Sequence, residues 1–180
     1  MIPTAVLIIC AIIYGVTMKV ADLLDEHGLK WFKYSNILFG FLWGIAGVLV
    51  ILLSNPIVVS TVVAMNIAFI VRNRLDFLNH QIAATLIIVA GIISDNIVSI
   101  PFLGFLIVFL IFGALKDQLD DVIHVKGMAF ILSETMLYYP IPTFLYCLFY
   151  GNWILFWIFA TYTVAYDLTK LIYNRSQKRN

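Results

Sequence analysis

Length, composition and charge place the chain among membrane proteins. It has 180 residues, of which 63% are hydrophobic and 12% charged, and its mean hydropathy is +1.01. Soluble domains carry about 25% charged residues, so the composition excludes a water-soluble globular domain, a disordered chain and a nucleic-acid binder with a basic surface. The formal net charge of +1 does not indicate any particular class of binding partner. We therefore predict an all-α, multi-pass membrane protein with a single transmembrane helical domain over residues 1–180.

Seven apolar runs separated by turn-forming residues are candidates for membrane-spanning helices. A helix needs about 20 apolar residues to cross a bilayer, with roughly 17–25 as the usual range. The fourth run is the shortest and could equally be an interfacial or buried segment. The predicted spans are Ile2–Met18, Tyr34–Leu53, Ile57–Val71, Ile82–Ile93, Ile97–Leu115, Met128–Phe149 and Trp153–Ile172.

The distribution of charge predicts how the seven spans are oriented. With seven crossings, all eleven Lys and Arg residues fall on one side, and Asp95 is the charged residue left on the other. The positive-inside rule then puts the N-terminus outside and the C-terminus in the cytoplasm, in the cell membrane. In the second span, Gly40, Gly44 and Gly47 recur at spacings of four and three, which predicts a closely packed helix face.

Acidic residues gather where the first, third and fifth runs end. Each of these three segments begins with a basic residue, continues with aspartates and ends with one of the three histidines. Residues at helical spacings of three, four and seven share a face. If the helices continue past the bilayer, three polar stripes follow: Asp22, Asp25 and Glu26; Asn73, Asp76 and His80; and Asp117, Asp120, Asp121 and His124.

Two interpretations of these stripes remain open. In the first they are solvated helix ends, paired with Lys19, Arg74 and Lys116. In the second they surround a cytoplasmic cavity that holds a hard cation, because carboxylate and amide oxygens suit Mg²⁺ together with substrate phosphates. The candidate residues are Asn73, Asp76, Asp117 and Asp121 for Mg²⁺, Asp117, Asp120 and Asp121 for catalysis, and Arg72, Arg74, Lys116, Asp22, Asp25 and Glu134 for substrate. A zinc site from the pairs Asp76–His80 and Asp120–His124 is a further possibility.

The fifth-run segment resembles a motif of a known enzyme family. Lys116-Asp117, with Asp120 three residues later and Gly127 in the following loop, resembles the second aspartate motif of the UbiA-type intramembrane prenyltransferases. Residues 72–76 resemble their first motif, Asn-Asp-x-x-Asp, with Arg74 in place of one Asp. In that family the two motifs bind Mg²⁺ and the substrate diphosphate, and the fold has nine helices. The resemblance covers about twenty residues, and this chain has one helical hairpin between the motifs where the family has two.

Two further acids lie inside predicted spans. Glu134 is about two turns into the sixth span, and Asp167 is near the inner end of the seventh, three residues before Lys170. An acid within a span is expensive and marks a candidate functional residue. The leading hypothesis is a Mg²⁺-dependent enzyme that acts on an isoprenoid or lipid phosphate or diphosphate at the cytoplasmic face. The alternative is a small cation or metabolite transporter or channel, with Glu134 and Asp167 on the pathway; a non-catalytic subunit is the third.

Overall fold

The regular structure of the chain is helical throughout the described residues. The computed structural model describes residues 4–25, 28–29, 31–122 and 139–177, with the backbone alone for 116–122. Every helix or strand assigned within these ranges is an α-helix, which confirms the predicted fold class at this level. In chain order the helices are α1 (Thr4–Asp25), α2 (Ser35–Leu53), α3 (Pro56–Val71), α4 (Leu78–Ile93), α5 (Ser99–Val122), α7 (Pro140–Tyr150) and α8 (Trp153–Gln177).

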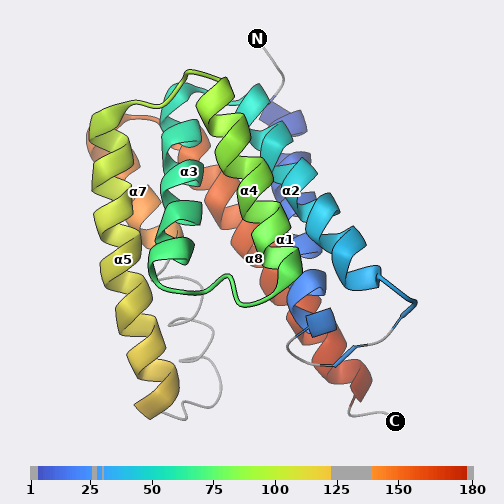
Figure 1. Cartoon of the computed structure of the whole chain (residues 1–180). Helices are drawn as coiled ribbons and strands as arrows, with labels where there is room; N and C mark the ends of the chain where they lie inside the picture. The colour runs from blue at the N-terminus through green and yellow to red at the C-terminus, as the bar shows by residue number, and fades with distance from the viewer. Residues whose placement is uncertain (1–3, 26–27, 30, 123–138, 178–180) are drawn as a thin grey trace.

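The helices run side by side and alternate in direction (Figure 1). The turns after α2, α4 and α7 lie at the end of the bundle near the N-terminus, whereas the connections after α1 and α3 lie at the end near the C-terminus. Helix α1 packs between α2 and α8, α2 packs on α4, and α3 packs on both α4 and α5. The described Lys and Arg residues belong to the half of the bundle nearer the C-terminus, and we call this end of the bundle the basic end. Its residues include Lys33, Arg72, Arg74, Lys170 and Arg175.

Local sequence signals account for where several helices begin and end. The side chain of Asn55 accepts hydrogen bonds from the backbone N–H groups of Ile57 and Val58, both at 3.1 Å, so it caps α3 just before Pro56. Helix α7 ends at Gly151, whose φ of 75° lies in the left-handed region that glycine adopts without strain. The two turns also touch, because the amides of Asn55 and Asn152 bond to each other at 3.3 Å. These contacts fix the order of helices at the end opposite the basic end.

The glycine face of α2 packs against α4, as its spacing predicts. A Cβ atom at Gly40 would lie 2.7 Å from the Cα of Asn79, and one at Gly44 would lie 3.1 Å from the Cα of Ala83. One further turn along, a Cβ at Gly47 would lie 2.6 Å from the side chain of Ile87. The two helix backbones can therefore approach closely only because α2 has no side chains there. This contact brings the first turn of α4 next to α1 and α2.

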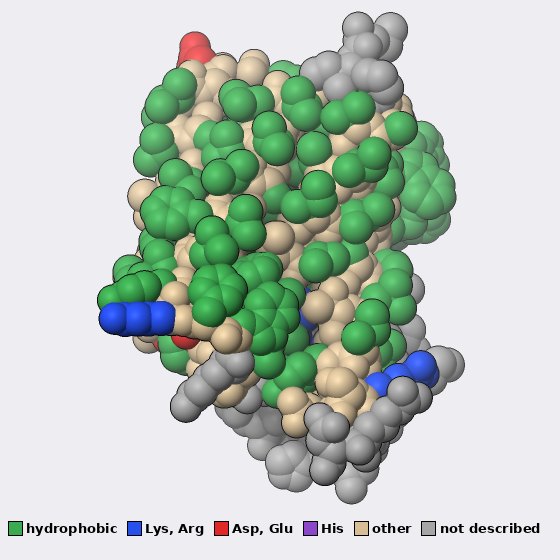
Figure 2. Space-filling model, turned by 90° about the vertical axis from the view of Figure 1, so that its right-hand side faces the viewer, with side chains coloured by type: hydrophobic (Ala, Val, Ile, Leu, Met, Phe, Trp, Pro, Cys, Tyr) green, Lys and Arg blue, Asp and Glu red, His purple; other side chains and the backbone are tan. Residues whose placement is uncertain are grey.

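The outer surface of the bundle is strongly hydrophobic. Figure 2 shows one face covered by hydrophobic side chains over most of its height, with Lys and Arg toward one end and an acidic side chain at the other. Many large apolar side chains of α2 are exposed, including Leu38, Phe41, Ile45 and Leu52. Two of the described helices, α1 and α2, are long and apolar enough to cross a membrane, whereas α3, α4, α7 and the apolar part of α5 are shorter. The predicted segments are thus confirmed as helices over the described residues, and a membrane association is indicated weakly.

Candidate functional site

The last turns of α1 place ionisable side chains inside the bundle. Asp22 lies one turn before α1 ends, and it is only 5% exposed. Lys19, on the same helix, is 3% exposed, and His80, in the first turn of α4, is 6% exposed. A buried charge is tolerated only where it is paired and hydrogen-bonded. The contacts of these three side chains therefore carry the argument for a site.

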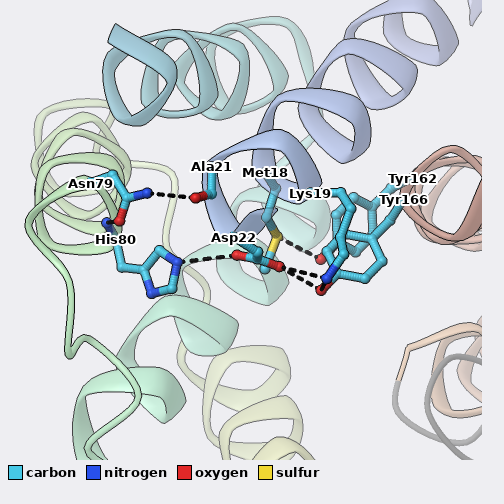
Figure 3. Close-up of polar contacts among 8 residues, drawn as sticks. All are labelled: Met18, Lys19, Ala21, Asp22, Asn79, His80, Tyr162 and Tyr166. Atoms are coloured by element: carbon cyan, nitrogen blue, oxygen red, sulfur yellow. Dashed lines mark hydrogen bonds and ion pairs between the residues drawn. The ribbon is translucent and has the colours of Figure 1, made fainter. Parts of the chain in front are cut away.

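Both carboxylate oxygens of Asp22 have partners (Figure 3). Oδ1 lies 3.0 Å from Nε2 of His80, which comes from α4. Oδ2 accepts a hydrogen bond from the Tyr166 hydroxyl of α8 at 2.5 Å and lies 3.4 Å from Nζ of Lys19. Nζ of Lys19 also donates to the Tyr166 hydroxyl at 3.0 Å and lies 4.7 Å from the centre of that ring. We call Lys19, Asp22, His80 and Tyr166 the Asp22 cluster; it joins three helices.

The geometry of the cluster constrains where its protons are. An ionised carboxylate only accepts hydrogen bonds, so with Asp22 ionised it is Nε2 of His80 that carries a proton. The Tyr166 hydroxyl donates its one proton to Asp22, and it accepts from Lys19. With Lys19 charged and His80 neutral, the cluster has no net charge. Protonation of Nδ1 would give His80 a positive charge and leave its hydrogen bond to Asp22 in place.

The neighbours of His80 hold its ring in this orientation. The amide of Asn79 donates to the carbonyl oxygen of Ala21 at 2.9 Å and accepts from the backbone N–H of His80 at 2.7 Å, so it fastens α4 to α1. The rings of Trp43 and Phe77 meet the imidazole nearly at right angles, with centroids 5.5 and 5.6 Å away. The imidazole is therefore positioned by three separate parts of the chain.

The connection between α3 and α4 also contacts α5. The guanidinium of Arg72, directly after α3, donates from Nη2 to the carbonyl oxygen of Gly113 at 2.8 Å. A Cβ atom at Gly113 would lie 2.2 Å from Nη1 of Arg72, so a larger residue there would displace the guanidinium from its present place. Asp117 is four residues after Gly113 on α5, so its backbone lies about 6 Å further along the helix axis. Residues 72–80 thus touch α5 at one end, through Arg72, and α1 at the other, through the Asp22 cluster.

The predicted stripe along the end of the third run is wrong. Helix α3 ends at Val71, and Asn73 has a φ of 54°, which turns the chain out of the helix. Asn73 and Asp76 are exposed in the connection and His80 belongs to α4, so the three do not share a helix face. The predicted zinc pair Asp76–His80 loses its helical spacing for the same reason. Arg74 is exposed in the same connection.

The predicted stripe on α1 is divided between two neighbours. Asp22 faces α4 and α8, whereas Oδ1 of Asp25 accepts from the amide of Asn36 on α2 at 3.0 Å. The solvated interpretation is wrong for Asp22, which is buried with Lys19. Asp25 is half-buried and borders a cleft of about 380 Å³ at the basic end, also lined by Leu24, Leu29, Trp31, Phe32, Lys33, Ser35 and Asn36. Glu26 lies outside the described residues.

Helix α5 continues through the acidic segment of the fifth run. Its backbone is helical to Val122, so Asp117, Asp120 and Asp121 keep the helical spacing that the sequence predicts. Their side chains and that of Lys116 are outside the described part of the structure, as are all atoms of His124 and Glu134. Asp167 is half-buried on α8, directly after Tyr166 of the Asp22 cluster.

The described side chains do not form a metal centre by themselves. Among them, no group of three or more His, Cys, Asp or Glu side chains converges on a point where a metal ion could bind. Asn73 and Asp76 supply an amide and a carboxylate oxygen, which are the donor types that Mg²⁺ takes, and both are exposed at the basic end. The Mg²⁺ prediction thus depends on adding the carboxylates of α5 to these two.

Lys19 and Tyr166 of the Asp22 cluster were not among the predicted site residues, and His80 was named only as a possible zinc ligand beside Asp76. In the sequence, Lys19 is the basic residue at the end of the first run, and His80 belongs to the second predicted stripe. Tyr166 is the residue before Asp167. The spacing of three between Lys19 and Asp22 was the available signal for their ion pair. Tyr166 is 144 residues from Asp22 and gives no local signal.

Comparisons of the chain with known protein families, with curated proteins and with solved structures find no match.

Proposed function

We propose that the chain crosses a membrane seven times, with α7, whose 11 residues span about 16 Å, as one part of the sixth crossing, predicted over Met128–Phe149. The bundle turns hydrophobic side chains outward on α1, α2, α4, α5, α7 and α8, and large exposed apolar surfaces mark contact with lipid or with partners. The four connections from α1 to α5 alternate between its two ends, as consecutive membrane crossings require. The 16 residues of α3 and of α4 span about 24 Å, against about 30 Å of hydrocarbon, so these helices need the neighbouring turns or local thinning of the bilayer.

The charge asymmetry supports an orientation with the basic end in the cytoplasm. Lys33, Arg72, Arg74 and Arg175 lie at that end, and among the described residues Asp95 is the charged side chain at the other. Lys and Arg are retained on the cytoplasmic side of membranes. This orientation puts the N-terminus outside and the C-terminus in the cytoplasm.

We further propose that the protein is an enzyme that binds an isoprenoid or lipid phosphate or diphosphate at this cytoplasmic end. One observation carries the proposal: residues 72–80 reach from the acidic end of α5, at Gly113, to the acidic end of α1, at Asp22. Basic and acidic groups of three chain segments therefore belong to one end of the bundle. Such a mixture suits a phosphate bound together with a cation. The resemblance of residues 116–121 to the second prenyltransferase motif supports the same class of substrate.

Each group has a separate role in this proposal. Arg72, Arg74 and Lys116 bind the phosphate oxygens, and the two arginines do so through their forked guanidinium groups. Asp117, Asp120 and Asp121, with Asn73 and Asp76, are the candidates to hold Mg²⁺, which would neutralise charge on the leaving diphosphate as its C–O bond breaks. Asp22, by contrast, uses both oxygens within its own cluster. We therefore assign it to positioning the connection rather than to direct contact with substrate.

A transporter is the second candidate, and the Asp22 cluster favours it. Ionisable residues buried in membrane bundles often form proton relays or ion pathways, and histidine titrates near neutral pH. His80 meets Asp22 between α1 and α4, Tyr166 donates to Asp22 from α8, and Asp167 is the next residue on that helix. On this alternative, a proton taken up by the cluster drives movement of a cation or metabolite, with Asp167 and Glu134 on the pathway.

One set of variants in lipid vesicles distinguishes the two functions. The enzyme proposal expects release of diphosphate from geranyl diphosphate, with water as the acceptor of the geranyl group in this assay. The release should require Mg²⁺, should be abolished by Asp120→Asn and should be unchanged by Asp95→Asn at the opposite end. The transporter alternative expects a flux of a cation or metabolite across the vesicle membrane that depends on a pH gradient and needs no Mg²⁺. This flux should be lost in His80→Gln or Glu134→Gln. A Mg²⁺-independent flux with no diphosphate release would overturn the enzyme proposal.

A further inference from the structure

The connection from α1 to α2 presents aromatic side chains to the surface of the basic end. Trp31, Phe32 and Tyr34 are 54%, 55% and 62% exposed. Tryptophan and tyrosine are enriched at the interface between a membrane and water, where their rings lie at the level of the headgroups. On the membrane orientation proposed above, a lipid headgroup on the cytoplasmic side is therefore the molecule that this connection meets.

The backbone of the connection is held in place at both of its ends. Beyond α1, the backbone N–H of Leu29 donates to the carbonyl oxygen of Leu23 at 3.0 Å, and Gly28 has a φ of 70°, which glycine adopts without strain. Directly before α2, Tyr34 has a φ of 68°, which is uncommon for a residue other than glycine. The connection thus turns sharply at two points, and the side chains between these points keep defined positions.

A cleft of about 380 Å³ lies between this connection and the last turn of α1. Its lining includes one acidic and one basic side chain, Asp25 and Lys33, together with the rings of Trp31 and Phe32. The indole of Trp31 meets the ring of Phe39 on α2 edge to face, with centroids 5.3 Å apart. One water molecule needs roughly 10–15 Å³ of this kind of volume. The cleft therefore has room for a group of many atoms and not only for a single ion.

The two charges that line the cleft are not paired with each other. Oδ1 of Asp25 accepts a hydrogen bond from the amide of Asn36 at 3.0 Å, and its other oxygen, Oδ2, has no partner within the described part of the chain. Nζ of Lys33 lies 4.9 Å from the centre of the Tyr34 ring, and none of the described acidic side chains forms an ion pair with it. An acid and a base that border one cleft without meeting are complementary to a ligand that carries both charges.

The groups that line the cleft select the chemistry of this ligand. An ionised carboxylate only accepts hydrogen bonds, so Oδ2 of Asp25 suits a primary ammonium, which only donates. The faces of Trp31 and Phe32 attract the same cation, and Lys33 can bind a phosphate oxygen. We propose that the cleft binds the headgroup of phosphatidylethanolamine, with its ammonium at Asp25 and its phosphate at Lys33. The site rests on the proposed membrane location and is separate from the proposed substrate site, because it uses none of residues 72–80.

Native mass spectrometry of the full chain in detergent tests this site. The probes are three lipids with the same dioleoyl chains: phosphatidylethanolamine, phosphatidylcholine, whose quaternary ammonium has no N–H, and phosphatidylglycerol, which has no ammonium. We expect phosphatidylethanolamine to bind about tenfold more tightly than either of the others, because each of these lacks the hydrogen bond to a charged carboxylate.

Matched variants link this preference to the two charged side chains. Asp25→Asn keeps an acceptor for Asn36 and removes the charge, so the affinity for phosphatidylethanolamine should fall about tenfold, to that for phosphatidylcholine. Lys33→Gln should weaken the binding of all three lipids, because each carries a phosphate. Asp95→Asn and Arg175→Gln are the controls, since they make the same changes of charge outside the cleft and should leave the preference unchanged.

The outcomes separate this site from the membrane proposal on which it rests. The site is overturned if phosphatidylcholine or phosphatidylglycerol binds as tightly as phosphatidylethanolamine, or if the preference survives in Asp25→Asn. Binding of water-soluble phosphoethanolamine with the affinity of the lipid would overturn the assignment to a membrane lipid. Failure of all three lipids to bind would contradict the membrane location together with the site, whereas equal binding of all three would overturn the site alone.

Discussion

Removing the carboxylate of Asp22 should strongly destabilise the bundle. The substitution Asp22→Leu leaves Lys19, which is 3% exposed, without its ion-pair partner, and it deprives Tyr166 and His80 of their acceptor. Breaking a buried ion pair by removing one member costs about 3–5 kcal/mol. For a chain of this size, 1 kcal/mol corresponds to roughly 2–4 °C in the unfolding temperature. We therefore expect the unfolding temperature to fall by about 6–20 °C.

Thermal unfolding followed by circular dichroism in one detergent measures this fall. The control is Asp76→Asn, at an exposed position, where surface substitutions change stability by no more than about 0.5 kcal/mol. The double variant Lys19→Met with Asp22→Leu should recover part of the loss, because it removes the stranded charge as well. The reasoning is refuted if Asp22→Leu and Asp76→Asn unfold at the same temperature. It is also refuted if the double variant unfolds at a lower temperature than Asp22→Leu alone.

Four other substitutions, in three experiments, test the packing, the site and the topology. Gly40→Val places a Cβ 2.7 Å from a backbone Cα of α4, so it should cost at least about 1–3 kcal/mol in the same unfolding assay. Gly113→Ala displaces the guanidinium of Arg72 and should weaken the binding of geranyl diphosphate, measured by calorimetry, more than it lowers the unfolding temperature. In sealed cells, a membrane-impermeant maleimide should label Asn96→Cys. The same reagent should label Arg74→Cys only after the cells are permeabilised. The native cysteines Cys10 and Cys147 are buried, so background labelling should be low. Labelling of Arg74→Cys from outside would reverse the proposed orientation.

The helical segments could be predicted from the sequence because their signals are local. Apolar runs of sufficient length and turn residues such as Asn55 and Gly151 act through neighbours a few residues away. The spacing of the glycines on α2 is visible locally too, although the helix that they pack against is α4. The end of the third run at Val71 agrees with the end of α3, whereas the expected continuation of that helix to His80 was wrong. That end is set locally: Asn73 adopts the left-handed conformation, and the backbone N–H groups of Asn73 and Arg74 donate to the carbonyl oxygens of Ile70 at 3.0 Å and Phe69 at 2.9 Å. Asparagine is one of the residues that favour this way of ending a helix.

The partners of Asp22 could not be predicted, because they lie far from it in the sequence. Helical periodicity identifies which residues share a face, but it does not identify the helix that this face meets. His80 is 58 residues from Asp22 and Tyr166 is 144 residues away, so the cluster exists only because α4 and α8 both lie beside α1. The acidity of the helix end was visible in the sequence, whereas its burial was a consequence of packing.

The central claim is that the basic end binds a lipid phosphate together with a divalent cation, and a direct binding measurement tests it. Calorimetric titration of geranyl diphosphate into the purified chain in nanodiscs should show saturable binding that requires Mg²⁺. The binding should be lost in Asp117→Asn and retained in Asp95→Asn. Absence of binding in the presence of Mg²⁺, or equal binding after Mg²⁺ is removed by a chelator, would contradict the claim.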